Sequence, residues 1–184
     1  MITAEQKAQA QRSAAELFRA AGIAFTAAET ERIEVADFGL SNLDIEGAQI
    51  LTMVQTERIG AKVIALTPGQ TLPEHWHPPM GGDPGKEETV RLQWGTLYFC
   101  TDGPDTLKKA SVPAGKENVY TLRSETVMHP GDQLYCSPGE KHWFQAGPNG
   151  AVVFSFSSVA RDVLDQFTDP AVRRVTRLKE YSGG

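Results

Sequence analysis

The sequence has no long hydrophobic run, and Met1 leads into a polar, alanine-rich stretch. A membrane-spanning helix needs about 20 consecutive apolar residues. A secretion signal needs an apolar segment close to the N-terminus. We therefore expect no membrane partner and no signal peptide, and we assign the protein to the cytoplasm.

Positive charge and cysteine are also scarce. The 18 Lys and Arg residues are outnumbered by 23 Asp and Glu residues, the formal net charge is -5, and no basic run occurs. Because binding to phosphate backbones depends on clustered positive charge, we expect no nucleic-acid partner. The two cysteines, Cys100 and Cys136, both lie in apolar runs typical of strands. We expect buried, reduced thiols, with a bridge between them as the less favoured alternative.

The chain is instead rich in turn residues and short apolar segments. It has 17 Gly and 11 Pro among 184 residues, and a length of this order suits one domain spanning residues 1–184. From residue 45 onward, runs rich in β-branched and aromatic residues alternate with Gly, Pro and Asn clusters. These runs cover 49–56, 61–66, 90–101, 119–127, 132–136 and 151–157. The pattern predicts an all-β fold, an antiparallel sandwich or barrel over 45–157.

Two segments flank this predicted barrel. Residues 1–23 are expected to form an amphipathic helix, because Thr3 and Gln6 are spaced as a capping box and Gly22 suits a helix end. The apolar residues recur at helical spacing between them. After the barrel, residues 158–184 are expected to form a charged tail with a short helical stretch over 159–167, which ends before Pro170.

Three of the four candidate metal ligands lie within residues 69–95. His75 and His77 lie two apart, Glu88 follows, and His142 comes after a Pro-Gly turn at the start of a later strand-like segment. Three imidazoles and one carboxylate form a mixed nitrogen and oxygen donor set, which suits a divalent transition metal. In an extended segment alternate side chains share a face, so His75 and His77 point the same way. The sequence therefore predicts one metal site.

The same alternation distinguishes the charged residues near Glu88. Lys86 is two residues away and shares its face, whereas Glu87 faces away, so we favour Glu88 over Glu87 as the ligand. Lys86 is the candidate catalytic residue, because from this position it can donate a hydrogen bond to a developing alkoxide. It can also carry a proton if burial lowers its pKa. The alternative is that Lys86 and Arg91 are solvated charges at a loop margin.

The spacing of these residues resembles the two sequence motifs of the cupin superfamily. Gly69, five residues, His-x-His, then Glu88 and, after six residues, Gly95 resemble the first motif. Gly131, Pro138-Gly139 and His142 resemble the second. The spacer between His77 and Glu88 is longer than usual, and Gln145 replaces a common asparagine. The resemblance implies a cupin-type antiparallel β-barrel, or jelly roll, with an N-terminal helix and a short C-terminal helical tail.

The longer spacer narrows the resemblance. The runs P-G-Q-T-L-P-E-H-W-H-P-P and P-G-K-E-E-T-V-R-L-Q-W-G, with V-A-D-F-G-L upstream, resemble the D-lyxose isomerase family. This implies a metal-dependent aldose-ketose isomerase that converts free D-lyxose to D-xylulose, and D-mannose to D-fructose. It implies His75, His77, Glu88 and His142 as metal ligands, with Mn²⁺ as the expected ion and Co²⁺, Fe²⁺, Ni²⁺ or Zn²⁺ as alternatives. It also implies a homodimer.

Two other functions use the same residues. A cupin dioxygenase would hold iron with the three histidines and the glutamate and would activate oxygen. A non-catalytic cupin would bind a sugar and convert nothing. Other residues have simpler roles: we expect His129, Lys116 and Glu117 to be exposed, and the aromatic residues near the motifs to be packing residues. These are Trp76, Trp94, Trp143 and Phe144. The spacer glycines are expected to form a loop at the mouth of the site.

Overall fold

A computed structural model describes residues 1–159 and 161–179 of the chain. Helix α1 (Ala4–Ala20) is capped by Thr3, whose side chain accepts a hydrogen bond from the Gln6 backbone, while the Gln6 side chain accepts one from the Thr3 backbone. The predicted capping box is confirmed. A short helix α2 (Ala27–Glu31) follows. Neither helix in this part of the chain has the length and apolar character that a membrane crossing demands.

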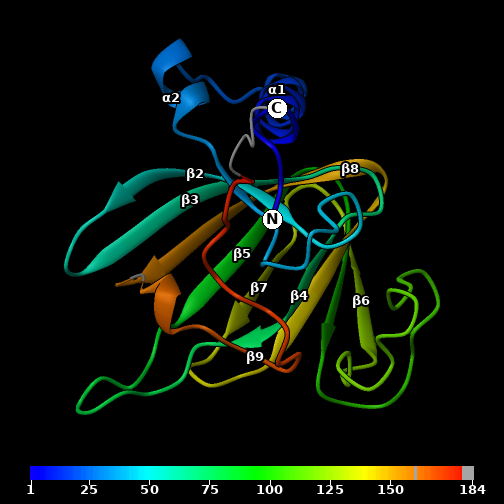
Figure 1. The fold of residues 1–184 in the computed structure, drawn as a ribbon. Coiled ribbons are helices and arrows are strands. Elements are labelled where there is room, and N and C mark those ends of the chain that lie inside the picture. Colours follow the sequence, from blue (N-terminus) through cyan, green and yellow to red (C-terminus); the bar gives the residue numbers. More distant parts are fainter. Residues whose placement is uncertain (160, 180–184) are drawn as a thin grey trace.

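The remaining elements build one curled antiparallel sheet (Figure 1). Its strands are β1 (Glu34–Ala36), β2 (Ala48–Gln55), β3 (Ile59–Leu66), β4 (Thr71–Trp76), β5 (Glu88–Thr101), β6 (Ser124–Met128), β7 (Gln133–Cys136), β8 (His142–Ser158) and β9 (Gln166–Phe167). Along one path the order is β1-β2-β3-β8-β4-β9, and β5 pairs with β6, β7 and β8. The predicted all-β, cupin-type antiparallel fold is confirmed.

Strands β5 and β8 are the two longest strands of the sheet, and they pair with each other along almost their whole length. The register shifts twice, near Gln93 and near Thr96, which lets both long strands bend around the core. Gly95 lies between the shifts at a φ of 83°, and a Cβ atom there would lie 2.1 Å from the carbonyl oxygen of Gly150. Only glycine permits this approach, which explains the glycine in the first motif.

The largest apolar cluster fills the inside of the curled sheet, and a second one lies between its outer face and α1. Figure 1 shows α1 outside the sheet, beyond the ends of β2 and β8. Phe18 of α1 packs there with Leu51, Val63 and Val152. The helix therefore covers part of the outer face. Cys100 and Cys136 are both free and buried, as predicted, and burial raises the pKa of Cys100 to about 12.

Two predicted elements were wrong in part. The apolar run 119–127 becomes a strand only from Ser124, because Tyr120 and Leu122 pack into a separate cluster with Trp143 and Cys100. The helical stretch expected over 159–167 is reduced to one 3-10 turn, Asp162–Leu164. The chain then extends to form β9, since the backbone at 166–167 pairs with β4. Residues 160 and 180–184 of the predicted tail lie outside the described residues.

Candidate metal centre

Strand pairing brings the histidines of the two motifs together. His75 lies in β4, opposite His142, the first residue of β8. His77 follows β4 with the same alternation as His75, as the spacing predicted. The turn at Pro138-Gly139 precedes β8 as expected. His75 and His142, which are 67 residues apart in the sequence, therefore lie opposite each other on neighbouring strands.

Glu88 completes the group as the first residue of β5. One ligand atom from each of His75, His77, Glu88 and His142 can be chosen so that all four lie within 4.8 Å of one another. All four residues are buried, and His142 is fully so. The structure thus brings together the four side chains that the sequence grouped. Any chemistry at this cluster would take place away from bulk solvent.

In both His75 and His142 a hydrogen bond made by Nδ1 leaves the other ring nitrogen, Nε2, for a different partner. His75 Nδ1 lies 2.9 Å from the Pro73 carbonyl oxygen, and His142 Nδ1 lies 3.1 Å from that of Glu140. A ring nitrogen facing a carbonyl must donate, so Nδ1 carries the proton and Nε2 has the free lone pair. His142 Nε2 is buried and has no hydrogen-bond partner among the described residues. A buried lone pair without a donor fits a metal ligand.

The charge states of the rings agree with this orientation. Burial, together with the neighbouring histidines, holds the pKa of His75 well below its usual range. Burial in the same way lowers the pKa of His142 to about 4. Both rings are therefore neutral near pH 7, as metal coordination requires. His77 differs: burial would lower its pKa, but the carboxylates of Asp165 and Glu88 outweigh burial and raise it.

Glu88 is held as a carboxylate by its neighbours. Its Oε2 lies 3.0 Å from His77 Nε2 and 3.4 Å from Lys86 Nζ, while Oε1 accepts a hydrogen bond from Ser155 Oγ. Burial alone would raise the pKa of Glu88, but Lys86 and His77 hold it well below its usual range. Glu87 is exposed and accepts a hydrogen bond from Tyr135 instead. The structure therefore places Glu88, and not Glu87, beside the three histidines.

Lys86 lies inward beside Glu88, as alternation predicted, with a side chain that is 9% exposed. Burial favours the neutral amine, but the negative charges of Glu88, Asp165 and Asp162 outweigh it and raise the pKa of Lys86. A pKa lowered by burial was the condition for Lys86 to carry a proton, and it is not met because three carboxylates lie near the ammonium group. Lys86 is thus a cation at neutral pH and a hydrogen-bond donor.

A cavity beside the cluster is lined in part by His75, Lys86 and Glu88. The sequence did not reveal the residues that β3 and the C-terminal segment add to this cavity. Asp165 Oδ1 lies 2.7 Å from His77 Nδ1, and the Phe167 ring stacks on His75 with centroids 5.8 Å apart. Asp162 forms ion pairs with Lys62, Lys86 and Arg174. No local motif marks these positions. The segment that carries them follows Glu88 by more than seventy residues, so only the folded chain reveals them.

The charged and aromatic residues outside the cluster lie where the sequence predicted, with the exception of Lys116. His129 and Arg91 are exposed, as expected. Lys116 is not: its ammonium group pairs with Asp169 and lies 3.4 Å from Glu46, because the loop folds back onto the C-terminal segment. The aromatic residues predicted to pack do so in three separate clusters, containing Phe144, Trp94 and Trp143 in turn.

The inserted spacer lies beside the cluster, as expected. Its loop lines a pocket that reaches His77 and Lys86, together with Val159, Arg161, Leu164 and Asp165. Asp83 of the spacer forms an ion pair with Arg161 at 2.7 Å, so the two segments are joined across this pocket. Trp76 points to the other side of β4, where the Lys141 ammonium lies 4.6 Å from the ring centroid.

Curated relatives cover almost the whole chain. The D-lyxose ketol-isomerase of Cohnella laeviribosi is 52% identical over 168 residues, which is 91% of this chain and 92% of that protein. A D-lyxose/D-mannose isomerase of Thermosediminibacter oceani is 42% identical, covering 98% of this chain and all of that protein. A D-lyxose ketol-isomerase of Thermofilum sp. is also 42% identical, over 97% of the chain. No protein-family model matches the sequence.

Solved structures support the same fold. The L-ribose isomerase of Cellulomonas parahominis superposes with a TM-score of 0.77 over 97% of this chain and 98% of its own, at 17% identity. The L-ribose isomerase of Acinetobacter sp. DL28, in complex with L-ribose, has a TM-score of 0.76 at 16% identity, covering 93% of this chain and 94% of its own. These similarities establish the fold, while the sequence relatives establish the family. The chain belongs to the D-lyxose ketol-isomerase family.

Proposed function

We propose that the protein is a metal-dependent aldose-ketose isomerase that converts free D-lyxose to D-xylulose and D-mannose to D-fructose. The observation that carries the proposal is the buried cluster of three histidines and Glu88, in which His142 Nε2 lacks a partner among the described residues. The names of the curated relatives support the substrates. They do not favour the dioxygenase or the non-catalytic alternative.

The donor set fits a divalent ion. The two neutral imidazoles of His75 and His142, the Glu88 carboxylate and His77, whose Nδ1 donates to Asp165 and whose Nε2 faces Glu88, would hold it. We propose Mn²⁺ as the ion. When bound, such an ion stabilises negative charge on sugar oxygens as a Lewis acid. Asp165 would fix the orientation of His77, as carboxylates beside metal-bound histidines do. We propose Lys86 as the group that donates a hydrogen bond to the oxygen on which charge develops.

The charges around the cavity support a neutral substrate. Lys62, Lys86 and Arg174 line it, and each is paired with a carboxylate: Lys62 and Arg174 with Asp162, and Lys86 with Glu88. A phosphate group would need cations that are free to neutralise it. Paired charges instead offer donors and acceptors in equal measure, which suits the hydroxyl groups of a free sugar.

The activity is tested by following D-lyxose and D-mannose by proton NMR in deuterated water. Protein stripped with EDTA and reloaded with Mn²⁺ is expected to form the ketose without oxygen, and the stripped protein is expected to form none. Deuterium at the product carbon would indicate an enediol that exchanges with solvent, and its absence would favour a hydride shift. Oxygen consumption with either sugar, or no product under any metal, would contradict the proposal.

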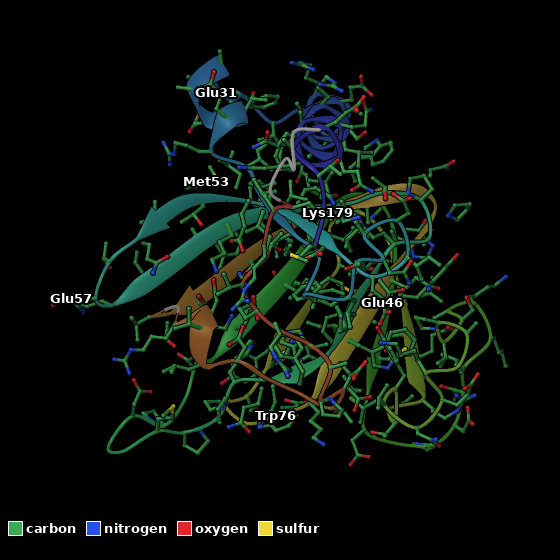
Figure 2. All side chains as sticks on the ribbon, viewed as in Figure 1. Glu31, Glu46, Met53, Glu57, Trp76 and Lys179 are labelled. Carbon is green, nitrogen blue, oxygen red and sulfur yellow. The ribbon has the colours of Figure 1, made fainter. Side chains whose placement is uncertain are left out.

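We further propose a cytoplasmic homodimer. The free, buried thiols of Cys100 and Cys136 support a reducing compartment. Apolar side chains stay exposed on the outer face of the sheet where α1 does not cover it, and a second copy of the chain could bury them. These are Val54, Ile59, Tyr135 and Phe156, which are between 42% and 56% exposed. In Figure 2, Met53 and Glu57 mark the β2–β3 hairpin that extends this region away from the rest of the molecule.

A further inference from the structure

Glu74 is buried on the opposite face of β4 from His75, its neighbour in the chain. It is 1% exposed, and no ion pair joins it to a described residue. A buried carboxylate without a cation is costly unless hydrogen bonds satisfy both oxygens. The cluster of metal-ligating side chains does not include it. Its role therefore depends on which donors it binds and on what those donors position.

Four donors satisfy the carboxylate, and they come from two segments. Oε2 accepts hydrogen bonds from the backbone nitrogens of Thr121 and Leu122, at 2.6 Å and 3.0 Å. Oε1 accepts from the hydroxyl groups of Thr121 and Thr168, at 2.8 Å and 2.6 Å. The Thr168 backbone nitrogen also donates to the Glu74 carbonyl oxygen at 3.1 Å. One side chain thus ties β4 both to the loop before β6 and to the segment after β9.

Strand β9, which Thr168 follows directly, supports two histidines of the cluster. Phe167 is in register with His75 and stacks on its ring. Asp165, just before β9, bonds His77 Nδ1. The strand has only two residues, each paired with one residue of β4. So short a strand has few backbone bonds of its own, and its position depends on side-chain ties such as that between Glu74 and Thr168.

We propose that Glu74 is a positioning residue for the metal centre. It acts through Thr168 and β9, which set the orientation of the His77 and His75 rings. This inference rests on the proposed function, because it requires that these histidines bind the ion. Glu74 itself does not contact the ion. Its removal is expected to weaken metal binding, beyond any effect on folding stability.

Two matched substitutions separate positioning from stability. Thr168→Val and Thr121→Val each remove one hydroxyl donor from the same oxygen of Glu74 with little change in volume, but only Thr168 adjoins β9. Titrating metal-free protein with Mn²⁺ by calorimetry is expected to show an affinity about tenfold lower for Thr168→Val, the lower end of the effect of outer-shell residues. Thr121→Val is expected to bind like the wild type, and Thr168→Ser to restore wild-type affinity.

A second variant tests Glu74 directly. Glu74→Gln is expected to lose at least as much Mn²⁺ affinity as Thr168→Val, with the melting temperature of each metal-free variant showing whether it is folded. If Glu74→Gln does not fold, the threonine pair decides the question. Equal affinity losses in the two valine variants, or none in either, overturn the proposal while the proposed function stands. Wild-type protein that binds no Mn²⁺ overturns both.

Discussion

Replacing His142 with alanine is expected to abolish both metal binding and the conversion of D-lyxose. His142 is fully buried and is neutral because its pKa is lowered to about 4, and its Nε2 has no partner within residues 1–159 and 161–179. Loss of an outer-shell partner costs a metal site about 10- to 100-fold in affinity, so loss of a ligand is expected to cost more than about 100-fold. The measurement is the Mn²⁺ content after dialysis, together with the rate of ketose formation.

The fourth histidine of the chain provides the control. His129 is exposed and lies outside the cluster, so His129→Ala is expected to keep both metal content and activity. Circular dichroism of both variants would show whether the barrel still forms. A folded His142→Ala variant with wild-type metal content and activity would refute the assignment of this histidine. Equal losses in both variants would also refute it.

Replacing Lys86 with alanine is expected to have a different effect, a large loss of turnover without loss of metal. A group that transfers or stabilises a proton in the transition state contributes about 10²- to 10⁴-fold to the rate. The Lys86 ammonium lies 3.4 Å from Glu88 and repels a cation bound there, so the variant is expected to bind Mn²⁺ at least as tightly. Comparing kcat with Mn²⁺ content separates the two effects.

Arg91 is the matched control for Lys86. It is also a cation near the start of β5, but it is exposed and hydrogen-bonds Gln133 on the outer face. Arg91→Ala is expected to retain wild-type turnover and metal content. Full activity in Lys86→Ala would exclude a catalytic role for the lysine. A loss of activity proportional to a loss of metal would make Lys86 a support for the metal centre only.

The parts of the site that the sequence could predict depend on local periodicity. His75 and His77 share a face because side chains alternate along an extended chain, and the same rule placed Lys86 beside Glu88. These inferences need only the spacing of neighbouring residues. Their agreement with the structure shows that the backbone is extended on both sides of the spacer, at β4 and at β5.

The rest of the site depends on contacts between distant segments. Asp162 and Asp165 reach the cavity only because residues 166–167 pair with β4, and nothing in their immediate sequence marks that pairing. The run at 119–127 was predicted as one strand from its apolar residues. The backbone nitrogens of Thr121 and Leu122 bond the buried carboxylate of Glu74 instead of a neighbouring strand. These hydrogen bonds, together with the packing of Tyr120 and Leu122 against Trp143, therefore overrode the local β pattern.

We propose that one ion is bound by four side chains: His75 in β4, His77 just after it, Glu88 in β5 and His142 in β8. The most direct measurement is an anomalous difference map from crystals of the Mn²⁺-loaded protein, with data collected on both sides of the manganese absorption edge. We expect one strong peak within bonding distance of His75 Nε2, His77 Nε2, His142 Nε2 and a carboxylate oxygen of Glu88. A peak elsewhere, or no peak in a fully loaded and active protein, would contradict it.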